Sequence, residues 1–114
     1  MLPRENRLQK SRDFDFVYKK GRFFNTKFFG LKYVKNGLLQ SRIGFVVSTK
    51  VHKKATKRNL LKRRMREVVR LNLDNIRPGF DVVITSRTGA WELEYREIER
   101  DMLFMLKRIE LISK

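Results

Sequence analysis

The sequence predicts a small α+β fold, an α/β sandwich in which helices pack on a single mixed four-stranded sheet. Its 114 residues, 41% of them hydrophobic, are enough for one compact core and too few for two. Apolar residues alternate with a period of two in some segments and follow a helical period in others. The expected order is α-β-β-β-α-β-α with about three helices, so we expect one domain over 1–114.

The first twenty residues are expected to form an arm and a short helix. Residues 1–10 are polar and basic, which favours an extended arm. Ser11 is suited to cap a helix over 12–20, because its hydroxyl can accept a hydrogen bond from a free amide of the first turn. The carboxylate of Asp13 suits that first turn, and Gly21 is suited to end the helix.

Two segments rich in aromatic and β-branched residues follow, over 27–34 and 42–49. Asn36-Gly37 between them is a turn signal, so we expect the two strands to pair as an antiparallel hairpin. Phe23-Phe24 is a candidate for a short additional strand before them.

The second half of the chain reads as helix, strand, helix. A helical period runs from 55 to about 73, Pro78-Gly79 breaks the chain, and 80–85 forms a strong strand before a final amphipathic helix over 94–111. On a helical wheel of the first of these helices, one face is apolar and is expected to pack on the sheet. It carries Leu61, Met65, Val68 and Val69, and the polar face carries Asn59, Lys62, Arg63, Arg66 and Arg70.

Positive charge is concentrated in the first part of the chain. The net charge is +16, and residues 1–66 hold 20 Lys and Arg against three acids, whereas 67–114 hold 8 against 9. Within 50–66 there are nine Lys and Arg and no carboxylate. A solvated helix face usually mixes both signs, so this segment favours contact with a polyanion, first of all nucleic acid.

Several other functions are not indicated by the residues. The chain has no cysteine, no apolar run long enough for a membrane span and no secretion signal, which fits a cytoplasmic protein. His52 is the only histidine and has no evident partner for general acid/base catalysis. The carboxylates lie on separate elements, so we expect no catalytic residue, no metal site and no small-molecule substrate.

A specific motif lies within the basic segment. Arg58-Asn59 is followed by Lys62-Arg63 and then by Arg66-Glu67, and this run resembles the signature of the bacterial ribonuclease P protein subunit. Leu60 departs from the pattern, because the family usually has a third basic residue there. Similar features flank the motif along nearly the whole chain: Asn6-Arg7-Leu8, Asp13-Phe14, Val17-Tyr18, Arg42-Ile43-Gly44 and Gly79-Phe80-Asp81-Val82.

The resemblance implies a role for the chain and a topology. It implies an RNA-binding subunit that assists a catalytic RNA in removing the 5′ leader from precursor tRNA, by binding the leader and broadening substrate recognition. The catalytic RNA and precursor tRNA would be its partners, and the RNA would carry the chemistry and hold the Mg²⁺. The resemblance also implies a left-handed β-α-β crossover around the basic helix, whereas the general rule for such connections predicts a right-handed one.

The resemblance and the residue types together give two sets of candidate contacts. Single-stranded RNA is bound by aromatic side chains that stack on unpaired bases beside cations, and we expect alternate residues of strand 27–34 to face that RNA. The leader-binding set is Phe14, Val17, Tyr18, Phe28, Lys32 and Lys50. The set for the catalytic RNA is Arg58, Asn59, Lys62, Arg63, Arg66, Lys53 and Lys54.

Other interpretations remain open at this point. All the aromatic residues could be core, which is the expectation for Phe29, Phe45 and Phe80. The composition equally fits a ribosomal or other structural RNA-binding protein with no role in tRNA processing. A transcription factor with the basic helix in a DNA groove, or an autonomous protein nuclease, are further alternatives.

Overall fold

The computed structural model describes residues 2–112, and these form one four-stranded sheet with three α-helices and three short 3₁₀ helices. The strands are β1 (Arg22–Asn25), β2 (Phe29–Lys35), β3 (Arg42–Val46) and β4 (Phe80–Ser86). The helices are α1 (Ser11–Lys20), α2 (Ala55–Leu71) and α3 (Tyr95–Arg108), with 3₁₀ turns at Arg4–Asn6, Leu73–Asn75 and Ala90–Glu92. The predicted α+β class, element order and mixed sheet are confirmed.

The strand order β1-β2-β4-β3 corrects the expected pairing. We predicted a hairpin between β2 and β3, but β4 lies between them, antiparallel to β2 and parallel to β3. β4 is the most continuously buried strand, and its apolar run suits the centre of the sheet rather than an edge. The hairpin that does form joins β1 to β2, with Phe23 opposite Lys32.

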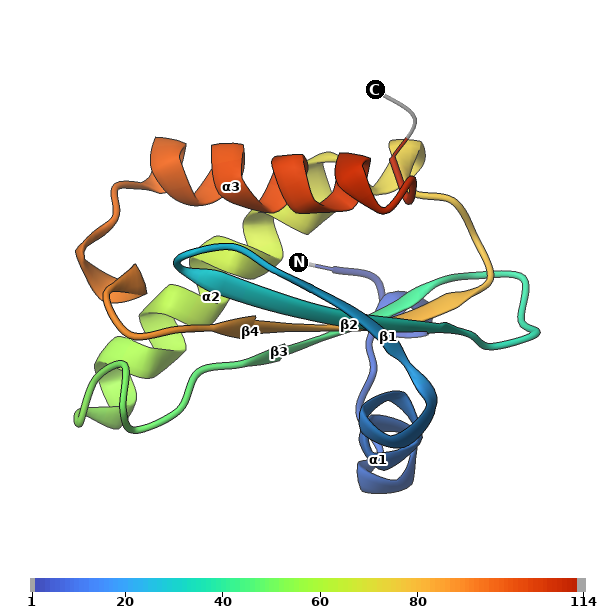
Figure 1. The fold of residues 1–114 in the computed structure, drawn as a ribbon, viewed down its shortest axis with the longest axis horizontal. Coiled ribbons are helices and arrows are strands. Elements are labelled where there is room, and N and C mark those ends of the chain that lie inside the picture. The colour runs from blue at the N-terminus through green and yellow to red at the C-terminus, as the bar shows by residue number, and fades with distance from the viewer. Residues whose placement is uncertain (1, 113–114) are drawn as a thin grey trace.

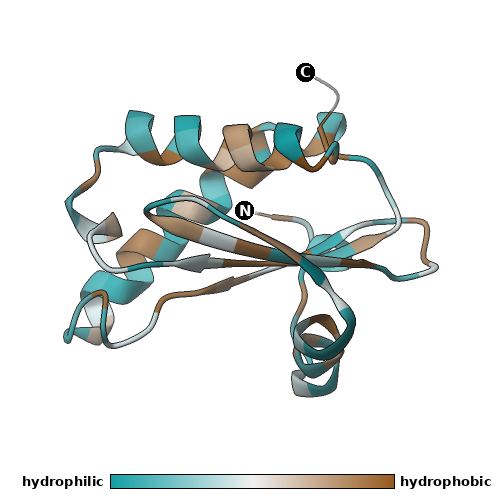
Figure 2. Ribbon diagram, viewed as in Figure 1, coloured by the Kyte–Doolittle hydropathy of each residue, from teal (hydrophilic) through white to brown (hydrophobic). Residues whose placement is uncertain are grey.

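Helices cover the two faces of the sheet unequally. α1 lies on one face, and α2 and α3 lie on the other (Figure 1). The main core forms on the α2 and α3 side, where the apolar sides of both helices meet the strands (Figure 2). As the helical wheel predicts, Leu61, Met65, Val68 and Val69 of α2 are fully buried there.

The N-terminal segment does not stand away from the domain as an arm. Leu2 is buried in the main core, whereas Leu8 is buried with Val17 and Val83 under α1. The segment therefore passes around the β3 edge of the sheet, where the amide of Leu8 donates to the carbonyl of Ile43 at 3.1 Å. This covers an otherwise unpaired strand edge with chain from the same molecule.

The helix boundaries follow the predicted signals to within a few residues. Ser11 is the first residue of α1 and not its cap, and Gly21 ends the helix as expected. An added Cβ at Gly21 would lie 2.5 Å from the carbonyl oxygen of Val17, so the helix end leaves no room for a side chain. None of the helices among the described residues is both long and apolar enough to cross a membrane.

Candidate nucleic-acid interface

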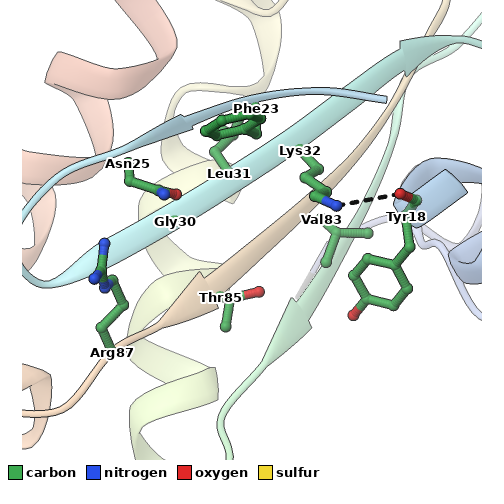
Figure 3. A pocket seen from close by; sticks show the side chains of 9 residues that line it. All are labelled: Tyr18, Phe23, Asn25, Gly30, Leu31, Lys32, Val83, Thr85 and Arg87. Carbon is green, nitrogen blue, oxygen red and sulfur yellow. Dashed lines mark hydrogen bonds between the residues drawn. The ribbon is translucent and has the colours of Figure 1, made fainter. Parts of the chain in front are cut away.

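A groove lies on the α1 face of the sheet, beside the C-terminal half of α1 (Figure 3). We call it the α1 groove; its volume is about 300 Å³. Side chains reach it from α1, β1, β2 and β4 because α1 covers only part of this face. The lining residues are Tyr18, Phe23, Asn25, Gly30, Leu31, Lys32, Val83, Thr85 and Arg87.

Tyr18 and Lys32 form the wall of the groove next to α1. The Lys32 ammonium donates to the backbone carbonyl of Tyr18 at 3.1 Å and lies 5.7 Å from the centre of the tyrosine ring. The Tyr18 side chain remains 43% exposed. Burial of the phenol, and then the charge of Asp15, raise the pKa of Tyr18, so the ring is neutral at physiological pH. An exposed ring beside a fixed cation is the arrangement that stacks unpaired bases.

Phe14 and Val17 support this wall from behind. Phe14 is half-buried, its ring centre lies 6.4 Å from that of Tyr18, and it packs over Gly44, where an added Cβ would be 2.4 Å from its ring. Val17 has no exposed surface and belongs to the small core under α1. The expectation that Val17 lines the groove is therefore wrong; it holds α1 against Val83.

Phe28 also lies elsewhere than predicted. We expected it to share a face with Lys32, but it precedes β2, where strand alternation no longer sets its direction. It packs against the main core and lines a different hollow, together with Arg100 and Phe104 of α3. Phe29 is fully buried in the core, as predicted, and Leu31 is buried with it.

Of the residues that line the groove, only Tyr18 and Lys32 were candidates from sequence, and three of those missed carry polar or aromatic groups suited to RNA. Phe23, which is 69% exposed, and Asn25 come from β1, and Arg87 follows β4. Phe23 and Asn25 share a face with Lys32 because β1 pairs with β2 in antiparallel register. The Phe23-Phe24 pair indicated a strand, but the sequence alone does not say which of the two rings faces the groove, because that depends on the pairing register with β2.

An ion-pair network ties α1 to the sheet. The Arg42 guanidinium donates to both oxygens of Asp81, at 2.9 and 2.7 Å, and reaches Asp13 of α1 at 3.3 Å. The Asp81 side chain is only 4% exposed and also accepts from the Asn36 amide at 2.8 Å. The hydrogen bonds that Arg42 donates to Asp81 raise the pKa of Arg42 above its ordinary value. This network links the first turn of α1, through Asp13, to β3 and β4.

The second candidate surface is the α2 ridge, which we define as Arg58, Asn59, Lys62, Arg63 and Arg66. Asn59 and Arg63 are exposed, and the other three are half-exposed along the same side of the helix. Arg66 lies over the Phe45 ring, 5.9 Å from its centre, so its guanidinium is held in place before any ligand arrives. These residues lie on the side of α2 away from its buried apolar face, as the helical wheel predicts, and their contact with RNA remains a prediction.

Arg58 has an internal role that sequence did not suggest. One of its guanidinium nitrogens donates to the carbonyls of His52 and Lys53, at 3.0 and 2.8 Å. This closes the loop before α2 and leaves the Lys53 and Lys54 side chains exposed beside the helix start. Lys50 is also exposed, in the same loop. The loop thus presents its lysines from a fixed backbone.

His52 is also used within the loop. Its Nδ1 accepts a hydrogen bond from the Lys54 amide at 3.1 Å, and its ring meets Trp91 edge-on at 5.0 Å between centres. Among residues 2–112, no three His, Cys, Asp or Glu side chains are grouped so that they could hold a metal ion.

The α1 groove and the α2 ridge are separated by the sheet. The groove opens on the face that carries α1, and α2 packs on the opposite face (Figure 1). The α1 groove, with its aromatic rings, and the cationic α2 ridge therefore face different directions. Two nucleic-acid segments can contact the molecule at once without competing for the same residues.

Comparisons with known proteins agree along nearly the whole chain. The family model described as Ribonuclease P matches residues 2–110. The ribonuclease P protein component of Alkaliphilus metalliredigens is 40% identical over 108 residues, which cover 95% of this chain and 96% of that protein. These matches do not favour the ribosomal-protein alternative.

Solved structures of two such proteins have the same fold. The protein from Thermotoga maritima superposes with a TM-score of 0.83 at 39% identity, covering 91% of this chain and 97% of that one. The Staphylococcus aureus protein superposes with a TM-score of 0.87 at 27% identity, covering 94% and 97%.

Proposed function

The chain belongs to the family of ribonuclease P protein components, and from this membership we propose that it works as one: it binds the catalytic RNA and the 5′ leader of precursor tRNA together. The observation that carries the proposal is the separation of the α1 groove from the α2 ridge by the sheet. One subunit can thereby hold an enzyme RNA on one side and its substrate on the other.

The α1 groove is assigned to the leader. A single strand needs a narrow path with ring faces for its bases and cations for its phosphates. Tyr18 and Phe23 supply exposed rings, and Lys32 and Arg87 supply the charges. Arg87 also donates to the Thr26 carbonyl at 3.2 Å, so this cation too is held at the groove by the backbone.

The α2 ridge is assigned to the catalytic RNA. Its groups are cations and an amide on one regular helix, which suits contact with a phosphate backbone more than the reading of bases. Lys53 and Lys54 extend the ridge beyond the helix start. Each phosphate that these residues neutralise releases condensed counterions, so binding here depends strongly on salt.

The chemistry is assigned to the RNA partner. We assign Mg²⁺ and the activated water to the catalytic RNA, while this chain positions the leader and screens the charge between two polyanions. The net charge of +16 supports the screening role. We propose that the protein works in the cytoplasm, together with these RNA partners.

Leader-dependent binding tests the proposal. We expect the protein, assembled with its catalytic RNA, to bind precursor tRNA more tightly than mature tRNA. Tyr18→Ala removes the exposed ring and should reduce that preference by about tenfold, because one base stack is lost. Titration of labelled precursor and mature tRNA against the assembled complex measures the effect.

Phe16→Ala is the matched control. Phe16 is an exposed ring of the same helix, 48% accessible, but it does not line the α1 groove. It should leave the preference unchanged. Equal loss of precursor and mature tRNA binding in Tyr18→Ala would contradict the groove assignment, and cleavage of precursor tRNA by the protein without RNA would contradict the assignment of chemistry.

A further inference from the structure

The two outer edges of the sheet differ in how the chain covers them. Along β3, the N-terminal segment forms a bridge between Arg7 and Ile43 and so covers that edge. Along β1, no strand or isolated bridge of residues 2–112 lies on the outer side. A free edge can pair with another chain, because its outward backbone groups have no partner in the sheet. The β1 edge is therefore open to a further strand.

The backbone of β1 directs alternate residues outward. The Thr26 amide donates to the Phe29 carbonyl at 2.8 Å, so it points toward β2. Because strand residues alternate, Phe24 also directs its amide and carbonyl toward β2, whereas Phe23 and Asn25 direct theirs outward. The edge thus offers both donors and acceptors, which another extended backbone can satisfy. Phosphate groups of RNA only accept, so they would leave the outward carbonyls unused.

Helix α3 borders this edge on the face away from the α1 groove and presents an exposed ring there. Phe104 is 55% exposed, and its ring centre lies 6.3 Å from that of Phe24. Beside it is a hollow of about 410 Å³, which we call the β1–α3 hollow. Its lining residues are Thr26, Lys27, Phe28, Arg100, Asp101 and Phe104. An exposed aromatic ring beside an open strand edge is suited to anchor an apolar side chain of a partner.

The charges along this border are mainly positive. Arg108 lies at one end, over the Phe24 ring and 5.8 Å from its centre. Lys27 and Arg100 are exposed in the lining of the β1–α3 hollow at the other end, where Asp101 is the one acid. A partner that matches this border carries acidic groups on both sides of its apolar anchor.

The spacing of these groups fits one side of a strand. Arg100, Phe104 and Arg108 are four residues apart, so they follow one side of α3 over about 12 Å. Three alternate side chains of a strand point the same way and span about 13 Å. Arg108 contacts Phe24, and the hollow near Arg100 reaches Thr26, so α3 runs antiparallel to β1. An added strand can therefore place an acid, an apolar residue and a second acid against these three groups.

We propose that the outer edge of β1 binds an extended acidic segment of a partner protein, which adds to the sheet as a fifth strand and places an apolar side chain on Phe104. A second copy of this chain fits less well. An interface between two copies brings identical patches together, and each patch would carry Lys27, Arg100 and Arg108 against the single acid Asp101. Such a partner needs no RNA in order to bind.

A labelled peptide with blocked ends tests the proposal. It has glutamate, valine and glutamate at alternate positions, with threonine between them, and its fluorescence anisotropy should rise on titration with the protein. In the control peptide, proline replaces both threonines, so the charge is kept but two donors to the strand edge are lost. The control should bind about tenfold more weakly. Equal binding of the two peptides would overturn the proposal, because charge alone would then account for it.

Phe104→Ala is the matched change on the protein, because it removes the anchor and no charge. The affinity for the threonine peptide should fall about tenfold, while the melting temperature changes little because the ring is largely exposed. Leu71→Ala is the control: Leu71 is also 55% exposed but belongs to α2, and its loss should not affect peptide binding. Unchanged affinity in Phe104→Ala would refute the anchor and with it the proposal.

Amide hydrogen exchange followed by NMR reports on the edge itself. The amides of Phe23 and Asn25 should exchange more slowly when the peptide is bound, whereas that of Phe24, which already points to β2, should not change. Absence of protection at both outward amides would contradict strand addition.

Two other occupants would also overturn the proposal, and each has its own signature. Sedimentation would reveal a second copy as a dimer of the protein that Phe104→Ala abolishes. Single-stranded RNA would displace the peptide, and Phe104→Ala would weaken RNA binding as much as peptide binding. We expect a monomer, and RNA affinity that Phe104→Ala leaves unchanged.

Discussion

Helices α1 and α2 lie on opposite faces of one sheet and are attached to it in different ways. Four residues of α2 are completely buried in the main core, whereas in α1 only Val17 is buried, in a small cluster with Leu8 and Val83. Polar ties replace the missing apolar area at α1: the Arg42 network below the helix and the Lys32 contact at its end. The position of α1, and with it the α1 groove, therefore depends on a few specific bonds, whereas the α2 ridge depends on charge carried by a firmly packed helix.

Of the variants considered, Asp81→Ala should have the largest effect, and it should affect α1 and the α1 groove but not the α2 ridge. It leaves the Arg42 guanidinium without its closest partner and removes one of the two acceptors of the Asn36 amide, which keeps only the Gln40 carbonyl at 3.1 Å. Breaking a largely buried ion pair from one side typically costs about 3 kcal/mol of unfolding free energy. Urea denaturation measures the loss, and leader-dependent binding should fall with it because α1 loses its anchor.

Glu67→Ala is the matched control for this ion pair. Glu67 also binds an arginine through both oxygens, but the pair lies in solvent on α2, where exposed ion pairs contribute little. No measurable change in the urea midpoint is expected. If Asp81→Ala is as harmless as Glu67→Ala, the position of α1 does not depend on the Arg42 network.

Gly44→Ala should act on α1 through packing instead of charge. The added Cβ would lie 2.4 Å from the Phe14 ring and 3.3 Å from the Cβ of Leu8, so the Phe14 ring must shift, which disturbs the packing of α1 on the sheet. Overpacking of this kind costs about 2 kcal/mol. Urea denaturation and the preference for precursor over mature tRNA should both show a loss.

Gly30→Ala provides the comparison for Gly44→Ala on the same face of the sheet. Its added Cβ would meet the side-chain oxygen of Asn25 at 2.7 Å, and that side chain can rotate away. Stability should hardly change, while the methyl group narrows the α1 groove and weakens leader binding. A loss of stability equal to that of Gly44→Ala would show that the Asn25 side chain cannot move away from the added methyl group.

The same difference explains how much of the fold could be predicted from sequence. The α2 face follows from a helical period, and Leu61 and Met65 are buried where the period places them. Strand pairing does not follow from a local pattern. The turn signal Asn36-Gly37 favoured a hairpin, but β2 pairs instead with β4, which is separated from it by more than forty residues of chain. The local sequence pattern of the intervening residues does not indicate a pairing between strands so far apart in the chain.

The candidate site divides along the same line. The ridge residues were predictable because one helix carries them all at fixed spacing. The groove is assembled from four elements, so Phe23 and Arg87 were missed, and Val17 and Phe28 were assigned to it although they face cores. Tyr18 and Lys32 were found because the helix period and the strand alternation each place them correctly on their own element.

Arg66→Ala should have the smallest effect on affinity, and the informative quantity is how the affinity for the catalytic RNA changes with salt concentration. Arg66 is held over the Phe45 ring, so its replacement removes a cation that was already in position without opening the core. Loss of one phosphate contact should lower the slope of log affinity for the catalytic RNA against log salt by about one. Filter binding across a salt series measures the slope.

Two further variants make the salt series decisive. Arg100→Ala removes an exposed cation of α3, outside the α2 ridge, and should leave the slope unchanged. Tyr18→Ala removes no charge, so it should weaken precursor tRNA binding at every salt concentration by a similar factor. If Arg66→Ala and Arg100→Ala changed the slope equally, binding would follow net charge alone. The α2 ridge would then bind RNA no differently from any other basic surface. A change of slope in Arg66→Ala alone would show that the released counterions come from phosphates bound at α2.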